Sequence, residues 1–315
     1  TDGGKIGIAN TFKYLASMGN NITFFCIHSK DIPKTQLEEA QKYGEIIISN
    51  HSTSNTIPRI AKSVFSSEPI YLDKHINAQI KQEIDILFEN NHFDVVHADH
   101  SAMAPLALYI KQKYQIPAGL RLHNVEYKIW QRYADNLPFF SPKKYYVQRQ
   151  AKLLKNQESL LYQKCDVCFS ITETDYVDAK EISPNANIIN VNTGIDYENW
   201  TANNTQKSDY ELVFASNFSW IHNVNAIEWF IKNVMPELKS KFPKITLKIL
   251  GANQPANFKN YADLGVISMG FVQEIQSHLS KANVYIAPLF VGSGVRIKIL
   301  EAMSMSLPVV ASPIS

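Results

Sequence analysis

The chain has 315 residues, of which 45% are hydrophobic and 19% charged, and its formal net charge at pH 7 is +2. This length predicts two domains of ordinary size, each with its own core. The small net charge argues against a general nucleic-acid partner, and no apolar run reaches the roughly 18 residues that a membrane-spanning helix needs.

Strands and helices alternate through the first half of the chain. Residues 5–19 have apolar side chains at helical spacing and end at Gly19-Asn20, a helix stop signal. Strands are expected at 22–27, 45–48, 94–97 and 119–122, with helices near 77–90 and from residue 102. Such alternation predicts a parallel sheet with helices on both faces. Ligands of these sheets bind beyond the carboxyl ends of the strands.

A second series of strands and helices begins at Glu211. We expect strands at 211–215, 245–250, 266–269, 284–287 and 308–311, and helices at 224–239 and around residue 301. The polar stretch 201–208 separates the two series and is interpreted as a linker. The sequence therefore predicts an α/β protein with two Rossmann-like, doubly wound domains, at 1–195 and 210–315; the alternative is a long loop within one domain.

A short loop of mostly small residues precedes the last expected helix. Its members are Gly292, Ser293, Gly294 and Val295. Unpaired N–H groups at a helix start attract phosphate, and Arg296 and Lys298 add positive charge there. The carboxylate of Glu301, one turn later, can accept two hydrogen bonds from a diol such as a ribose. This combination predicts a nucleotide-sugar site; the alternative is a surface turn with a solvated basic pair.

The order of these residues, Gly-Val-Arg-Ile-Lys-Ile-Leu-Glu-Ala-Met at 294–303, resembles the donor-site signature of retaining glycosyltransferases of family 4 (group 1). That family has the GT-B fold, in which two Rossmann-like domains face a cleft. The resemblance implies that Glu301 contacts the ribose and that protein cations replace a metal. The family's first glutamate falls on Ser293 here, which is a departure from the pattern.

A second departure follows the strand 211–215. Many members have a Gly-Arg at the position of residues 214–217, and a lysine shortly after it, which bind the diphosphate. This chain has neither, and His222 and Asn223 follow instead. We therefore expect Arg296 and Lys298 to bind the diphosphate and to stabilise the leaving group.

Two features of the first half complete the candidate site. Gly3 and Gly4 precede a helix, and glycine lets the backbone approach a ligand closely; the resemblance implies that this loop faces the donor phosphate or the acceptor. Polar residues at the ends of two strands form the expected acceptor pocket: His100, Arg121, His123, Asn124 and Glu126.

His123 has a particular role in this interpretation. The family often has a histidine at this strand end that contacts the acceptor or the transferred sugar, so His123 is our catalytic candidate beside Arg296 and Lys298. The alternative for His123 alone is a buried histidine paired with a glutamate. We interpret His97, two residues before Asp99, as a core residue, and we expect no metal site.

Residues 141–155 contain five basic residues and no acidic one, with aromatic and aliphatic residues between them. Such a segment is suited to an anionic membrane surface. The alternative is a solvated helix face packed on the sheet.

The resemblance implies transfer of a sugar from a nucleotide-diphosphate donor to a glycan or lipid-linked acceptor, with retention, in polysaccharide or cell-envelope synthesis. Alternatives are a sugar-nucleotide epimerase and a non-catalytic sugar-nucleotide-binding protein. The chain begins at Thr1 within a loop and ends at Ser315 after a strand, so we expect a fragment that lacks the first strand and the last helices. Three cysteines and no visible secretory signal predict a cytoplasmic location, and the basic segment 141–155 leaves peripheral contact with the inner face of the membrane open.

Overall fold

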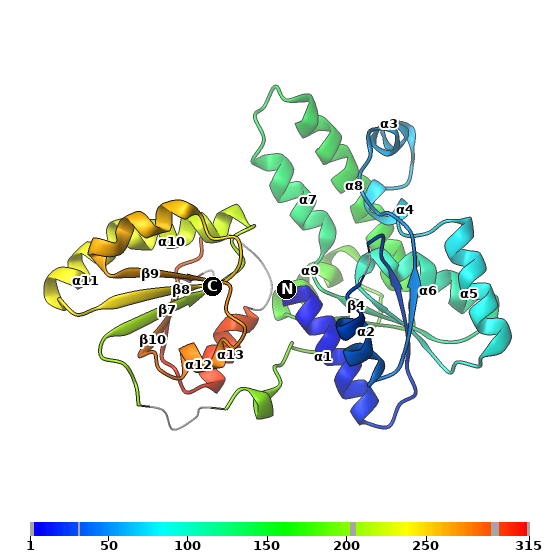
Figure 1. Cartoon of the computed structure of the whole chain (residues 1–315). Helices are drawn as coiled ribbons and strands as arrows, with labels where there is room; N and C mark the ends of the chain where they lie inside the picture. The colour runs from blue at the N-terminus through cyan, green and yellow to red at the C-terminus, as the bar shows by residue number, and fades with distance from the viewer. Residues whose placement is uncertain (1–2, 31, 202–205, 291–295, 314–315) are drawn as a thin grey trace. The chain divides into compact units, whose positions relative to one another are not determined.

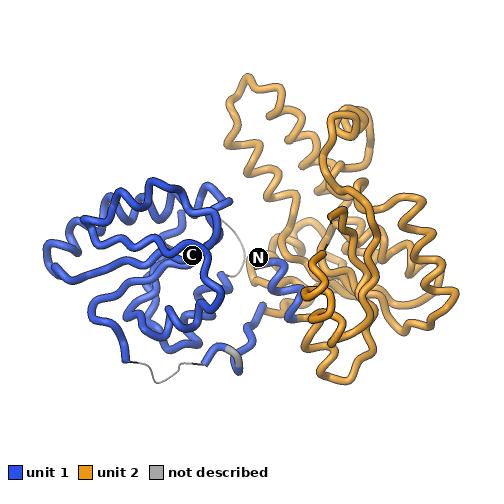
Figure 2. The backbone as a smooth tube through the Cα atoms, in the orientation of Figure 1, with its two compact units in different colours: residues 1–10, 193–315 blue, residues 11–192 orange. Residues whose placement is uncertain are grey.

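The computed structural model describes residues 3–30, 32–201, 206–290 and 296–313. Its internal contacts divide the chain into two units, shown in Figure 2. The N-terminal unit contains residues 11–192, and the C-terminal unit contains residues 193–315 together with 1–10. The first helix, α1 (Gly3–Ser17), crosses the boundary between them.

Parallel strands form the sheets of the N-terminal unit. Four of them pair in the order β3 (Val96–Asp99), β4 (Ala118–Leu122), β5 (Val167–Ser170), β6 (Ile188–Asn190), and β1 (Thr23–Ile27) pairs with β2 (Glu45–Ser49) in a separate sheet. Side chains alternate along a strand, so residues in register share a face. Leu120 and Cys168 are in register and lie in the buried core, whereas Asp99 and Arg121 share the opposite face.

Helices surround these strands, and Figure 1 shows α7 and α8 as a long antiparallel pair. The helices of this unit are α2 (Lys34–Gln41), α3 (Ile57–Phe65), α4 (Ile70–Asp73), α5 (Ala78–Asn90), α6 (Ala104–Tyr114), α7 (Glu126–Asp135), α8 (Pro142–Lys164) and α9 (Glu173–Ile182). The short 3-10 turn η1 (Ser101–Met103) joins β3 to α6. The helix α6 packs on β3 and β4. The chain passes from the end of β4 at Leu122 to the start of α7 at Glu126, so the strand end and the helix start are close together.

The C-terminal unit has one five-stranded parallel sheet. Its order is β11 (Val309–Ala311), β10 (Val284–Ala287), β7 (Glu211–Ala215), β8 (Thr246–Leu250), β9 (Val266–Gly270). Figure 1 shows α10 (Ile221–Asn233) and α11 (Met235–Lys241) on one face, with α12 (Gln276–Leu279) and α13 (Ile297–Ser304) on the other. The 3-10 segments are η2 (Tyr197–Asn199) and η3 (Ala256–Leu264). The predicted α/β class with parallel sheets is thus confirmed.

Some predicted boundaries differ from the structure. The helix expected at 224–239 is two helices, because Pro236 cannot continue a helix through its missing N–H but suits the first turn of α11. The strand expected at 94–97 lies at 96–99, since pairing with β4 begins at Val96. Gly3 and Gly4, expected to precede a helix, form the first turn of α1.

Candidate functional site

The start of α13 places three of the predicted donor-binding residues in the C-terminal unit. Arg296 is the N-cap residue, and the helix begins at Ile297. Glu301 is 2% exposed, and Nζ of Lys298 lies 2.8 Å from its Oε2. Burial raises the pKa of Glu301, and the positive charge of Lys298 opposes that rise. The helix therefore holds a buried carboxylate directly beside a half-exposed ammonium group.

A second helix start contributes to the same neighbourhood. His222 is the second residue of α10, which follows β7 in the chain. Burial lowers the pKa of His222, and the charge of Arg296 lowers it further. Burial also lowers the pKa of Arg296. The structure thus brings His222 within electrostatic range of Arg296, close to the strand where the family has its Gly-Arg.

The other predicted donor-binding residues lie either outside the described residues or at the start of α1. Gly292, Ser293, Gly294 and Val295 lie outside the described residues. Gly3 and Gly4 lie in the first turn of α1, and Gly4 is exposed. Trp200 was not predicted, yet its ring centroid lies 5.7 Å from Nζ of Lys298, and its carbonyl accepts a hydrogen bond from Ser304 on α13.

In the N-terminal unit, Asp99 joins two of the predicted acceptor-pocket residues. Its Oδ1 lies 2.6 Å from Nε2 of His123, and its Oδ2 lies 3.4 Å from Nη1 of Arg121. Burial by itself raises the pKa of Asp99, but the hydrogen bond from His123 and the charge of Arg121 leave it below its usual value. Because an ionised carboxylate only accepts hydrogen bonds, Nε2 of His123 carries a proton, and Nδ1 is the ring atom that remains for other chemistry.

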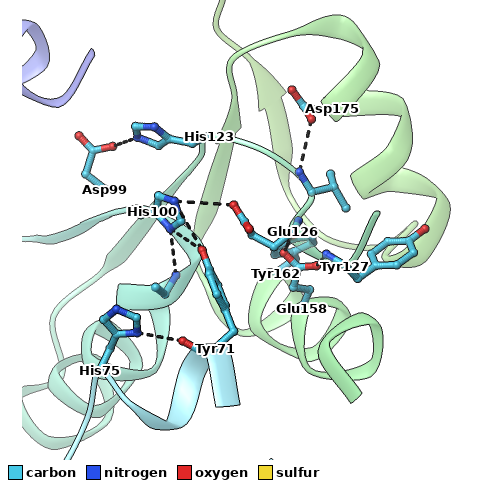
Figure 3. Close-up of polar contacts among 12 residues, drawn as sticks. Tyr71, His75, Asp99, His100, His123, Glu126, Tyr127, Glu158, Tyr162 and Asp175 are labelled. Atoms are coloured by element: carbon cyan, nitrogen blue, oxygen red, sulfur yellow. Dashed lines mark hydrogen bonds and ion pairs between the residues drawn. The ribbon is translucent and has the colours of Figure 1, made fainter. Parts of the chain in front are cut away.

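His100 also lies next to His123, as Figure 3 shows, and the centroids of the two rings are 5.2 Å apart. Its backbone has a φ of 131°, which is a strained conformation for a residue with a side chain. The hydroxyl of Tyr71 lies 2.7 Å from its Nδ1, and Glu126 Oε1 lies 3.7 Å from its Nε2. Burial, followed by the charge of His123, lowers the pKa of His100 to about 4, so this imidazole is neutral at pH 7.

Glu126 is the buried carboxyl group of this cluster. Burial raises its pKa to about 7, although hydrogen bonds from Asn124 and Tyr71 oppose the rise. A second buried carboxylate, Glu158 from α8, accepts hydrogen bonds from the backbone N–H groups of Glu126 and Tyr127 at 3.0 and 2.9 Å. Glu158 thus caps the start of α7 from a neighbouring helix.

The structure therefore brings together all five predicted acceptor-pocket residues, through contacts and electrostatic interactions that link His100, Arg121, His123, Asn124 and Glu126. Sequence reasoning missed Tyr71, Asp99, Glu158 and Thr11, whose hydroxyl accepts a 2.6 Å hydrogen bond from Arg121. Only Asp99 had a usable signal, because it ends a strand that neighbours the strand carrying Arg121.

The interpretation of His97 as a core residue is wrong. His97 is exposed, and it shares the Asp99 side of the sheet rather than the buried side of Ala98. Among the residues that the structure describes, no group of three or more His, Cys, Asp or Glu side chains could hold a metal ion.

Comparisons with known proteins give one sequence similarity over part of the chain and several structural similarities over nearly all of it. Residues 209–315 match the family of glycosyl transferases group 1. No curated protein matches the chain. Sucrose-phosphate synthase from Thermosynechococcus elongatus is similar with a TM-score of 0.66 and 14% identity, over 100% of this chain and 77% of that one.

Two further solved structures are similar over nearly the whole chain. HepE from Anabaena, in complex with UDP, has a TM-score of 0.61 and 13% identity over 100% of this chain and 78% of its own. A glycosyltransferase from Rickettsia africae has a TM-score of 0.60 and 14% identity, over 99% and 77%. Residues 209–315 are therefore similar in sequence to the group 1 glycosyl transferases, and the chain as a whole has the α/β fold of these solved glycosyltransferase structures, which is the GT-B fold.

Proposed function

We propose that this chain transfers a sugar from a nucleotide-diphosphate sugar to an acceptor hydroxyl with retention of configuration. The bond between the anomeric carbon and the diphosphate oxygen breaks, and a bond from that carbon to the acceptor oxygen forms on the same face. The acceptor proton passes to the departing diphosphate. In this scheme no protein side chain acts as a nucleophile.

The observation that carries the proposal is the buried Glu301 beside Lys298 and Arg296 at the start of α13, within the segment that matches the group 1 family. We assign the ribose to Glu301 and the diphosphate to Arg296, Lys298 and the N–H groups of the helix start. Positive groups fixed before the reaction stabilise charge as it develops on the leaving group. His222 adds a polar side chain near Arg296.

We assign the acceptor or the transferred sugar to the polar cluster of the N-terminal unit, with His123 as the catalytic residue. Nδ1 of His123 would contact a sugar hydroxyl while Asp99 holds Nε2. The domain boundaries at 1–195 and 210–315 belong to the same proposal. The proposal also includes a glycan or lipid-linked acceptor, a role in cell-envelope polysaccharide synthesis, and a cytoplasmic location at the inner face of the membrane.

A non-catalytic sugar-nucleotide-binding role is the second candidate. Ser293 in place of an acid, and the missing Gly-Arg after β7, favour it. An epimerase would consume the donor without any acceptor, so product analysis with donor alone separates it from a transferase.

The test is the thermal stability of the full-length protein with UDP, GDP, ADP and their sugar conjugates. UDP comes first, because HepE and the pneumococcal O-GlcNAc transferase GtfA were both solved with it. A ligand at about one hundred times its dissociation constant stabilises the folded state by roughly 2.7 kcal/mol. We expect a shift with one nucleotide that Glu301→Ala abolishes and Glu237→Ala, an exposed carboxylate on α11, does not. No shift with any nucleotide would contradict the donor site.

Arg296→Ala tests the chemistry itself. Removing one group that stabilises developing charge lowers kcat by about 10²- to 10³-fold in well-studied sites. We expect a loss of this order in sugar transfer, with the nucleotide still bound. Unchanged transfer would show that Arg296 has no role in leaving-group departure.

A further inference from the structure

The helix α3 exposes its apolar side and buries a polar residue. Ile57, Ile60, Val64 and Phe65 are exposed, Ile57 at 84% and Phe65 at 90%, and their spacing puts them on one side of the helix. The buried residue of α3 is Ser63, whose hydroxyl lies 2.7 Å from that of Tyr146 on α8. An amphipathic helix normally faces the core with its apolar side, so α3 is oriented to meet an apolar partner outside the unit.

A pair of exposed phenylalanines lies on the turn between α7 and α8. Phe139 and Phe140 are 67% and 89% exposed and stack edge to face with centroids 5.1 Å apart. Arg149 of α8 donates hydrogen bonds to the carbonyls of Ser63 and Ser66 at 3.0 and 2.7 Å. These bonds attach α3 to the N-terminal half of α8, and the turn with the two phenylalanines leads into the N-terminus of the same helix. Figure 1 shows α3 and the turn projecting from the same end of the unit.

Both segments are basic. Residues 57–67 contain Arg59 and Lys62 and no acidic residue, and residues 136–157 contain five basic residues and no acidic one. Exposed members include Lys62, Lys143 and Lys152. Apolar side chains surrounded by cations match the interface of a bilayer that carries anionic lipids.

Most aliphatic side chains of the segment 141–155 are not available for this contact. Val147, Ala151 and Leu154 are buried, and they attach α8 to the rest of the unit. The apolar groups available to a bilayer are those of α3, of the turn before α8 and of the exposed Tyr145 on α8. The sequence left open whether 141–155 contacts a membrane or is a solvated helix face, and α3 with the preceding turn adds exposed apolar groups beside that segment.

We propose that the apolar side of α3 and the Phe139-Phe140 turn form one docking surface for an anionic lipid bilayer. A second copy of the chain fits less well, because a two-fold symmetric contact would place this basic cluster against itself. Lipid phosphates complement the charge, and the phenylalanines enter the headgroup layer. The surface belongs to the N-terminal unit and does not depend on the donor chemistry proposed above.

Co-sedimentation of the full-length protein with vesicles tests this surface. One set is phosphatidylcholine, and the other is equal parts phosphatidylcholine and phosphatidylglycerol. We expect binding to the anionic vesicles that weakens as salt is added. Phe139→Ser with Phe140→Ser, and separately Ile57→Ser with Phe65→Ser, should each weaken that binding at least about tenfold. Lys62→Gln with Lys143→Gln should have an effect of similar size.

Matched controls are Ile86→Ser on α5 and Val177→Ser on α9, which remove exposed apolar side chains elsewhere in the unit. These should bind vesicles as the unchanged protein does, and circular dichroism checks that all variants fold. Absence of binding to anionic vesicles, or equal binding by the docking-surface variants, would overturn the proposal. A dimer in sedimentation velocity that the phenylalanine variants dissociate would overturn it in favour of a protein interface.

Discussion

The contact between Asp99 and His123 sets which ring nitrogen of the histidine is available. We expect Asp99→Asn to lower kcat for sugar transfer about 10- to 100-fold, because loss of orientation by about 1 Å can cost 10²-fold. KM should change little. Asp94→Asn, an exposed carboxylate before β3, is the matched control. An unchanged kcat would reduce Asp99 to a packing role.

Glu126 gives the fold a pH dependence. Its pKa is about 7 in the folded state, against an ordinary 4.5, so folding favours the neutral form. The stability that this neutral form contributes is complete below about pH 4.5 and is lost as the pH rises through 7. Glu126→Gln, neutral throughout, should therefore raise the free energy of unfolding at pH 8 by about 1–3 kcal/mol and not at pH 4. Denaturant unfolding at both pH values measures this, with the exposed Glu89→Gln as control.

Some residues of the candidate site could be predicted from the sequence, and others could not. Arg121, His123 and Glu126 stand in one short stretch at a strand end, where polar residues seldom serve packing. Tyr71 reaches His100 from the short helix α4, and Thr11 reaches Arg121 from α1. Such partners depend on how distant segments pack, which no local pattern records.

At the scale of elements, the end of β8 requires a glycine. Gly251 has a φ of +135°, and a Cβ there would lie 1.7 Å from the carbonyl oxygen of Ser216. We expect Gly251→Ala to destabilise the fold by about 2–4 kcal/mol, through strain and a displaced backbone. Gly194→Ala is the control, since no atom lies within 4 Å of its added Cβ. Equal midpoints in denaturant for the two variants would refute this explanation.

Elements with continuous apolar sequence were predicted well, because burial on both faces leaves a strong signal. The strands at 211–215 and 284–287 match β7 and β10. The break between α10 and α11 was missed, since apolar side chains continue at helical spacing across Val234 and only Pro236 marks the interruption. The helix α3 was also missed, although its apolar residues recur at helical spacing.

At the scale of the whole molecule, the two units should respond to a nucleotide differently. We assign the nucleotide to the C-terminal unit, so UDP should slow amide hydrogen exchange in residues 221–225 and 297–304. Residues 98–102 and 121–127 should exchange as before until an acceptor is added. Protection that appears first in the N-terminal unit would contradict the assignment of the donor to Glu301 and Arg296.

The division into two series and the parallel character of the sheets followed from the sequence, because alternating strands and helices leave few other arrangements. The separation of β1 and β2 from the other strands of the N-terminal unit did not. Strand pairing depends on contacts between backbones, whereas hydrophobic patterns report only which side chains are buried.

The length of α8 has a consequence of its own. Its first turn adjoins the phenylalanines, and Glu158, four turns further on, holds the backbone at the start of the polar cluster. A helix rises about 1.5 Å per residue, so the 16 residues from Pro142 to Glu158 span roughly 24 Å. If the proposed surface binds a bilayer, the number of residues in α8 sets the distance between that surface and the polar cluster.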